Sequence, residues 1–265
     1  MIAAPLDTGE AGRAMIAPAP DDPVAGSAER VAMMAKAAAR FAPIESQSLS
    51  DRVYRQLREK LMRGLLKPDE RLRLREVALA LGTSETPVRE AVFQLVRDGA
   101  LELKPHHYIR VRRLTVAQYL EIRDIRLLLE PLAAERALDH VDAAAIEELA
   151  AAHARLVAAE AAKEYEPAIR ANFEFHFGLY WRSGMPALIE LLENLWMRVG
   201  PMLNLLYPHG HPQYAVRHQH ENILDALRRR DRVGLTAAIR DDLLEGGRNF
   251  LRHIEALEAE GWRDE

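Results

Sequence analysis

The stretch that most constrains the fold is residues 47–114, where short helical patterns give way to two short alternating ones. Val53, Leu57 and Leu61 recur every fourth residue, and this spacing predicts an amphipathic helix over residues 50–63. Apolar side chains at that interval lie on one helical face and need a partner surface to bury them. The first helix of a packed unit is therefore expected here.

Two further helices and a hairpin are predicted in the same stretch. A short helix around residues 75–81 precedes a third helix that begins at Thr83-Ser84, two residue types that favour the N-cap position. After it, residues 101–103 and 109–111 alternate between apolar and polar side chains as strands do. Three helices, the last two separated by a tight turn, followed by a hairpin make a winged helix-turn-helix.

Charge is distributed unevenly along the chain. Residues 47–114 hold fifteen Lys and Arg against nine Asp and Glu, a net charge of +6, which leaves −10 for the rest of a chain whose total is −4. A basic segment on an acidic body is the electrostatic footprint expected of a nucleic-acid reader, because attraction to phosphates supplies most of the non-specific affinity.

The remainder of the chain has helical patterns from Thr115 onward and no strand signal of comparable strength. Thr115 and Asp142 are candidate N-caps, and no fixed period repeats, which argues against a solenoid. The expected fold class is mainly α, with an N-terminal winged helix-turn-helix followed by an all-α helical bundle. The helical patterns cover residues 115–139, 142–163, 167–183, 186–206, 216–230 and 235–260.

Three parts are expected along the chain. Residues 1–45, where Ala and Pro are frequent, should form a disordered tail ahead of domains over 46–114 and 115–260. The first residues lack the basic start and continuous apolar run of a signal peptide, and no stretch approaches the length of a membrane span. Cysteine is absent, which excludes disulfides and Cys-ligated zinc. These features predict a cytoplasmic protein with no membrane partner.

The N-terminal end of the third helix carries the side chains expected to meet DNA. In a helix-turn-helix this end faces base edges, while neighbouring residues bind phosphates. Arg89 lies one turn into the helix and can reach a guanine edge or a phosphate. Ser84 and Thr86 are short donors for phosphate oxygens, and Arg75 opens the second helix. For Arg89 taken alone, a surface ion pair is the competing interpretation.

A series of motifs runs through this segment in order. They are Leu49-x3-Val53-Tyr54-x2-Leu57, Arg71-Leu72, Arg75-Glu76-Val77-Ala78, Thr86-Pro87-Val88-Arg89-Glu90-Ala91 and Leu95-x3-Gly99-Ala100-Leu101. Together they closely resemble the winged-helix domain of GntR-family regulators, with the family's T-P-V-R-E-A core intact. The resemblance implies that Arg75, Thr86, Arg89 and the wing tip contact DNA.

The chain departs from that family at three places. Glu85 stands where the family usually has arginine, Tyr108 where the wing has glycine, and Pro68-Asp69 where it has Pro-Gly. A carboxylate cannot contact phosphate favourably but can accept from a cytosine amine, so Glu85 predicts a non-standard operator or weaker binding. The wing residues expected to take over minor-groove or phosphate contact are His106, His107 and Arg110.

The helical half contains a polar set compatible with metal binding. Asn172 and His176 are four residues apart and face the same way on one helix, while His220 and Asp242 lie on two later helices. From spacing alone, a packed or exposed histidine is the commoner outcome. No nucleophile motif, Gly-rich phosphate loop or HExxH is present, so nothing in this half demands an enzyme.

A second series of motifs extends over the helical half. They are Arg126-x3-Glu130-Pro131-x-Ala133-Ala134, Phe175-His176-x2-Leu179, Leu188-x2-Leu191-Leu192 and His220-x2-Ile223-Leu224-Asp225-Ala226-Leu227. They look like the FCD effector domain of FadR-type GntR regulators, many of which hold a divalent metal with one Asp and three His and bind small carboxylic acids. Others lack metal and bind acyl ligands. The resemblance implies metal ligands at Asn172, His176, His220 and Asp242.

Two of these four positions differ from the family: Asn172 replaces its Asp, and Asp242 replaces its last His. One carboxylate and two imidazoles remain, so zinc, nickel or manganese is still compatible, at lower affinity because an amide oxygen is a poorer donor. Arg126 matches an arginine that helps to hold the ligand carboxylate. Its alternative role is an i,i+4 pair with Glu130. The predicted effector site comprises Arg126, Asn172, His176 and His220.

Three more histidines surround a proline-containing loop: His209, His211 and His218. A solvated loop is expected there, with a substitute metal ligand as the alternative. Taken together, the sequence predicts a homodimeric DNA-binding regulator, of a type that is more often a repressor, with a pseudo-palindromic operator and a small carboxylic acid as effector. Two alternatives stay open: a metal-dependent helical-bundle enzyme, and an effector-less DNA-binding protein with a decayed ligand site.

Overall fold

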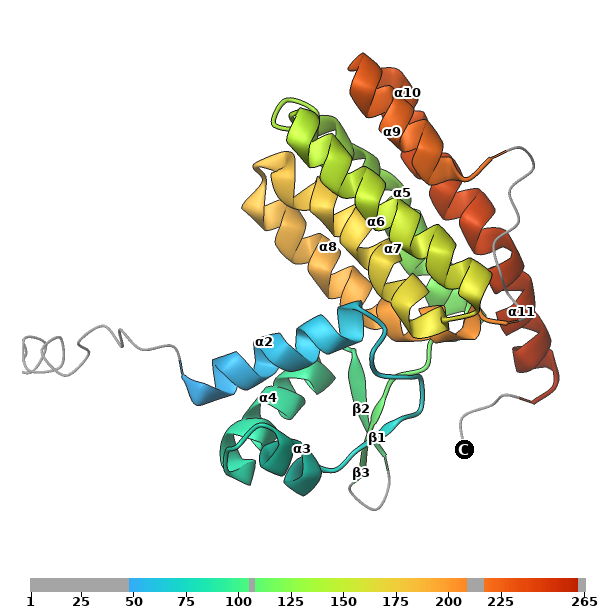
Figure 1. Cartoon of the computed structure of the whole chain (residues 1–265). Coiled ribbons are helices and arrows are strands. Elements are labelled where there is room, and N and C mark those ends of the chain that lie inside the picture. Colours follow the sequence, from blue (N-terminus) through green and yellow to red (C-terminus); the bar gives the residue numbers. More distant parts are fainter. Residues whose placement is uncertain (1–47, 105–107, 209–216, 262–265) are drawn as a thin grey trace, which may run out of the picture. The chain divides into compact units, whose positions relative to one another are not determined.

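The computed structural model describes residues 48–104, 108–208 and 217–261. A small sheet and three helices precede a larger set of helices along the chain (Figure 1), and this order confirms the predicted fold class. The predicted tail, residues 1–45, lies outside the described residues. Within the described residues, no helix is long and apolar enough to cross a membrane.

The first helix, α2, spans Leu49–Met62 and begins at a capping box. The Ser48 hydroxyl accepts from the backbone N–H of Asp51, and the Asp51 carboxylate accepts from that of Ser48. Helix α3 spans Leu74–Ala80 and α4 spans Glu85–Arg97. The core beneath these helices consists of the predicted stripe and the inner face of α4: Val53, Leu57, Leu61, Val88, Ala91, Val92 and Leu95.

The hairpin forms as predicted, and a third strand joins it. Strand β2 spans Leu101–Lys104 and pairs antiparallel with β3, Tyr108–Val111. Strand β1, Arg71–Leu72, pairs with the other edge of β3, so the sheet order is β1-β3-β2. Two residues are too few to show apolar–polar alternation, which is why the sequence did not reveal β1.

Helices account for the secondary structure from Val116 to Ala259 within the described residues. Thr115 and Asp142 cap α5 and α6 as expected, each accepting from a backbone N–H at the third helical residue. Figure 1 shows α5, α6, α7 and α8 side by side, with α10 packed on α5 and α9. The bounds are α5 Val116–Ala137, α6 Ala143–Ala162, α7 Tyr165–Tyr180, α8 Pro186–Val199, α9 Gln219–Arg229, α10 Arg232–Asp241 and α11 Gly247–Ala259.

The last predicted helix, residues 235–260, is interrupted in the structure. Helix α10 starts earlier, at Arg232, because the Asp231 carboxylate accepts from the backbone N–H of Gly234. A π-helical turn over Asp242–Gly246 then separates α10 from α11. Such turns concentrate at functional sites. This one presents Asp242 at the start of the turn.

Two glycines allow the end of α2 to approach the helical half closely. A Cβ at Gly200 would lie 2.8 Å from the backbone oxygen of Met62, so only glycine fits beside that carbonyl. A Cβ at Gly64 would lie 2.7 Å from Cγ2 of Ile169, and Gly64 also has a φ of +66°. The Asn204 amide donates to the Gly64 carbonyl oxygen at 2.8 Å. These contacts connect the winged-helix half to α7 and to the 3-10 turn after α8.

Candidate functional site

The N-terminal end of α4 is exposed as a DNA-reading helix requires. Ser84 occupies the N-cap position, although its side chain makes no capping hydrogen bond, which leaves the hydroxyl available for a phosphate. Arg89 Nη2 lies 3.8 Å from a Glu85 carboxylate oxygen, with both side chains about half exposed. An exposed pair at this distance is weak and can exchange for a nucleic-acid contact. The predicted contacts exposed here are Arg75, Ser84, Glu85, Thr86 and Arg89.

Arg110 requires a correction. Its side chain is 8% exposed, with Nη1 3.0 Å from an Asp69 carboxylate oxygen and Nε hydrogen-bonded to Glu102. Glu102 faces Arg110 across the β2–β3 pairing, so the sheet register itself places the two together. Burial works against the charge of Arg110, but these carboxylates outweigh it and raise the pKa. The guanidinium therefore connects β3 to Glu102 on β2 and to Asp69, and it is not placed to contact DNA.

The backbone conformation at Asp69 shows why an aspartate can stand where the family has glycine. Its φ is +65°, a left-handed conformation that glycine adopts freely and aspartate more readily than most residues. The two oxygens of its carboxylate form ion pairs with Arg110 Nη1 at 3.0 Å and with Arg113 Nη1 at 2.9 Å. The two predicted wing-tip contacts, His106 and His107, lie outside the described residues.

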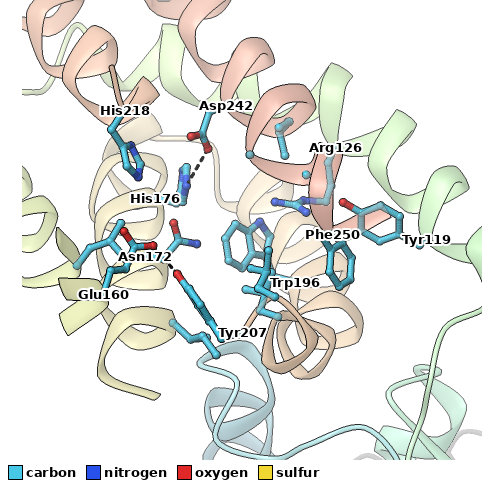
Figure 2. Close-up of a pocket in the computed structure, with 17 residues that line it drawn as sticks. Tyr119, Arg126, Glu160, Asn172, His176, Trp196, Tyr207, His218, Asp242 and Phe250 are labelled. Atoms are coloured by element: carbon cyan, nitrogen blue, oxygen red, sulfur yellow. Dashed lines mark hydrogen bonds and ion pairs between the residues drawn. The ribbon is translucent and has the colours of Figure 1, made fainter. Parts of the chain in front are cut away.

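A cavity lies among the helices of the second half (Figure 2). Its walls combine polar and apolar side chains, as small-molecule sites commonly do. Three of the four predicted effector residues line it: Arg126, Asn172 and His176. His220 is fully buried and contacts His176 instead of lining the cavity. The other lining residues are Tyr119, Leu156, Glu160, Ile169, Trp196, Leu203, Leu206, Tyr207, His218, Asp242, Leu243, Gly246, Gly247 and Phe250.

Three of the four predicted metal ligands converge at one end of this cavity. His176 Nε2 lies 3.2 Å from His220 Nε2 and 3.3 Å from an Asp242 carboxylate oxygen, and His220 Nε2 lies 3.9 Å from the other oxygen. Ligands about 2.0–2.1 Å from a tetrahedral zinc stand roughly 3.3 Å apart, so the spacing fits a divalent ion. Figure 2 shows Asn172 beside His176, on the same side of α7. The residues present therefore fit a metal.

One histidine of this cluster, His220, is held in the neutral form that metals bind. Burial, followed by the neighbouring His176, lowers the pKa of His220 well below its ordinary value. His176 Nδ1 lies 3.2 Å from the Tyr180 hydroxyl, an outer partner that orients the ring and leaves Nε2 toward the cavity. Burial and the Glu130 carboxylate raise the pKa of Tyr180 well above its ordinary value, so this hydroxyl keeps its proton.

Arg126 lies at the opposite end of the cavity. Its Nε donates to Glu130 at 2.6 Å, which is the i,i+4 pair foreseen as its alternative role. Burial opposes the charge of Arg126, but Glu130 outweighs this and its pKa is raised. The guanidinium carbon lies 4.6 Å from the centre of the Trp196 ring. Within the described residues, no hydrogen bond occupies its two terminal nitrogens, so the pair with Glu130 does not use up the fork of the guanidinium.

Near this cavity the sequence showed only part of the role of Glu130 and did not mark His153. Glu130, which is completely buried, binds Arg126, Tyr180 and Trp196 at once. His153, on α6, lies with its ring centre 5.4 Å from that of His220. The i,i+4 spacing predicted the pair of Glu130 with Arg126, but Tyr180, Trp196 and the partners of His153 come from helices distant in the sequence, which no local pattern marks.

A winged helix with an exposed reading helix, joined to a helical domain around a polar cavity, defines a class of DNA-binding transcriptional regulators. The chain belongs to the gntR family of bacterial regulatory proteins, whose model matches residues 49–111, and an FCD domain matches residues 121–245. Its relatives are transcriptional regulators, so the chain is a regulator and not an enzyme.

The chain is similar to several transcriptional regulators. It is 35% identical to the HTH-type transcriptional regulator McbR of Escherichia coli K12, over 71% of this chain and 86% of McbR. It is 26% identical to the transcriptional repressor RspR of the same strain, over 76% of this chain and 88% of RspR. The solved structure of E. coli McbR/YncC superposes with a TM-score of 0.65 at 31% identity, covering 82% of this chain and 100% of that one.

Proposed function

We propose that this regulator represses transcription by binding a pseudo-palindromic operator as a homodimer, and that a small organic acid in the cavity controls its affinity for DNA. One winged helix reads one half-site, so a two-fold symmetric pair is the arrangement that matches such an operator. The similarity to RspR, a repressor, supports the sign of the regulation. The observation that carries the effector proposal is the polarity of the cavity, which is lined by the cation of Arg126 and by His176 and Asp242, side chains of a kind that can ligate a metal.

Arg126 suits a carboxylate because its planar fork can donate two parallel hydrogen bonds. The side chain is almost completely buried, which strengthens a charge-assisted bond relative to one in water. Glu130 and Trp196 fix the direction of the guanidinium before any ligand arrives. A preoriented donor of this kind loses little conformational entropy on binding.

His176, His220 and Asp242 would hold a divalent ion at the other end of the cavity. Such an ion would supply a Lewis-acidic centre whose open position accepts an oxygen of the effector. Zinc, nickel and manganese are compatible with two imidazoles and one carboxylate. Asn172 adds an amide oxygen on the same side of α7, a weaker donor than the family's carboxylate.

The cavity wall is continuous with the contacts that connect the two halves. Ile169 lines the cavity and also stands 2.7 Å from where a Cβ of Gly64 would lie. Asn204, between the cavity residues Leu203 and Leu206, donates to the Gly64 carbonyl. An effector that binds one placement of these residues more tightly than another would shift the placement of the DNA reader.

The DNA part of the proposal is tested by Arg89→Ala, with Arg97→Ala at the other end of α4 as the matched control. Operator fragments are selected from a random-sequence library with the wild-type protein, and affinities are then compared at one fixed salt concentration. Loss of a base-edge contact at Arg89 should weaken binding by about 1–3 kcal/mol, roughly 5- to 150-fold, whereas Arg97→Ala should change little. Equal affinity of wild type and Arg89→Ala would refute the assignment.

The effector part is tested by metal analysis combined with a ligand screen. Bound metal is measured by mass spectrometry, and thermal shift is recorded with a panel of carboxylic acids in the metal-free and zinc-loaded protein. Acids that bind should raise the melting temperature of the wild type but not of Arg126→Met. A protein that holds no metal and is stabilised by none of the acids contradicts effector control.

A further inference from the structure

A second group of histidines shares His220 with the His176–His220–Asp242 cluster. His153 comes from α6, His218 from the N-cap of α9, and His220 from the first turn of α9. Their ring centres are 4.9 Å apart for His153 and His218, 5.4 Å for His153 and His220, and 4.3 Å for His218 and His220. One ligand atom from each lies within 4.8 Å of the others. This spacing is within reach of a single metal after small side-chain rotations.

Two buried nitrogens in this group have no hydrogen-bond partner among the described residues: Nδ1 of His153 and Nδ1 of His220. His220 is completely buried, and its Nε2 already faces His176 and Asp242. A buried polar atom without a partner is costly, and such atoms in native proteins commonly await an ion or a water. The unpartnered nitrogens thus point to a ligand on the side of His220 that faces away from the first cluster.

Contacts with neighbouring groups restrain the rings of His220 and His218. Phe175 stacks on His220 with ring centres 3.7 Å apart and planes 7° from parallel, so the ring of His220 cannot tilt. His218 Nδ1 accepts from the backbone N–H of His220 at 3.1 Å. Binding a metal through this nitrogen would exchange one neutral hydrogen bond for a metal–imidazole bond, which is the stronger of the two. His218 also lines the cavity, so a fourth coordination position could open toward it.

We propose that His153, His218 and His220 form a second divalent-metal site, distinct from the His176–His220–Asp242 set although it shares His220. Three imidazoles without a carboxylate select zinc, nickel or copper over magnesium, calcium or manganese. Burial, as the largest cause, lowers the pKa of both His153 and His220, which keeps the rings in the neutral form that binds metal.

The two sites are expected to fill one at a time near neutral pH. One neutral imidazole offers a single nitrogen lone pair to a metal, and two metals on His220 would require the ring to lose its one remaining N–H proton. The wild-type protein should then bind one zinc ion that occupies either site. The proposal rests on these side chains alone and not on effector control, so its failure would leave the proposed function untouched.

The experiment isolates the three-histidine site in a His176→Gln background, which removes one ligand of the first site. Full-length protein is stripped of metal, and zinc affinity is measured by competition with a chromophoric chelator. The visible spectrum of the cobalt-substituted protein reports ligand geometry. His176→Gln should still bind one zinc ion, and His176→Gln/His153→Gln should bind it at least about 100-fold more weakly, because losing a direct ligand costs more than losing an outer partner.

His176→Gln/His140→Gln is the matched control, since His140 is an exposed histidine away from the cluster. Circular dichroism and thermal unfolding confirm that each variant is folded before titration. The proposal is overturned if His176→Gln and His176→Gln/His153→Gln bind zinc with equal affinity. It is also overturned if neither variant binds zinc. An equally large loss in the His140 control overturns it as well.

Discussion

Glu130→Gln is the sharpest test of how the helical domain is held together. The Glu130 side chain is completely buried and its Arg126 partner is 8% exposed. One carboxylate oxygen accepts from Arg126 Nε and from Trp196 Nε1, both at 2.6 Å, and the other accepts from the Tyr180 hydroxyl at 2.8 Å. All three neighbours donate, so the carboxylate is the acceptor on which the cluster depends.

Glutamine keeps the shape of Glu130 but changes both its charge and its hydrogen bonding. Its amide nitrogen would face at least one donor, and Arg126 would become a buried cation without a counter-charge. Removing one partner of a buried ion pair lowers the free energy of unfolding by about 3–5 kcal/mol. Because the glutamine amide keeps one oxygen acceptor, we expect a loss near the lower end of that range. For a domain of this size, 3 kcal/mol corresponds to a fall of roughly 6–12 °C in the melting temperature.

The assay is urea unfolding followed by circular dichroism, with Glu76→Gln as the matched control. Glu76 pairs with Arg73 three residues away on the surface, where the two side chains are 66% and 73% exposed. Because water screens that pair, its loss should leave the unfolding midpoint unchanged within error. If Glu130→Gln unfolds at the same urea concentration as Glu76→Gln, the buried carboxylate does not hold the cluster and the reasoning is wrong.

Two further tests use the same unfolding measurement. Because burial lowers the pKa of His220 and His153 from 6.5, the unfolded chain binds more protons below that pH. The metal-free protein should therefore lose up to about 1.4 kcal/mol of stability per pH unit for each histidine as the pH falls below 6.5, and a flat profile from about pH 7.5 to about pH 5.5 contradicts this. Gly200→Ala should lower the free energy of unfolding by roughly 1–3 kcal/mol, because the added Cβ would clash with the backbone oxygens of Leu61 and Met62. A Gly200→Ala protein as stable as the wild type would show that the end of α2 and the turn at Gly200 can move apart without cost.

Local patterns predicted the elements well. The buried stripe of α2 follows from apolar residues at every fourth position, and Thr115 and Asp142 cap the helices they were expected to cap. These features depend on neighbours within one or two turns, and the sequence displays such neighbours directly. The same reasoning brought His176, His220 and Asp242 into one candidate site, although there the resemblance to a family supplied the pairing between distant helices.

Long-range partners account for what the sequence did not show. Arg110 is predicted to contact DNA because it belongs to the wing, yet it is buried and paired with Glu102 and Asp69, whose proximity follows from strand register and a turn. His153 has no distinguishing neighbours on α6 and acquires its chemical setting only when α6 packs on α9. Glu130 likewise looks like an ordinary helical ion-pair residue until Trp196 and Tyr180 converge on it.

The contact between Gly64 and Ile169 has a thermodynamic consequence. Ile169 belongs to the cavity wall, and Gly64 lies just beyond the first helix of the DNA reader. If this contact couples acid binding to operator binding, the coupling free energy is the same whichever ligand binds first, because coupling between two binding equilibria is reciprocal. To the extent that a bound acid weakens operator affinity through this route, operator DNA must weaken affinity for the acid by the same factor. A titration of the ligand with and without DNA would therefore measure the coupling without any transcription assay.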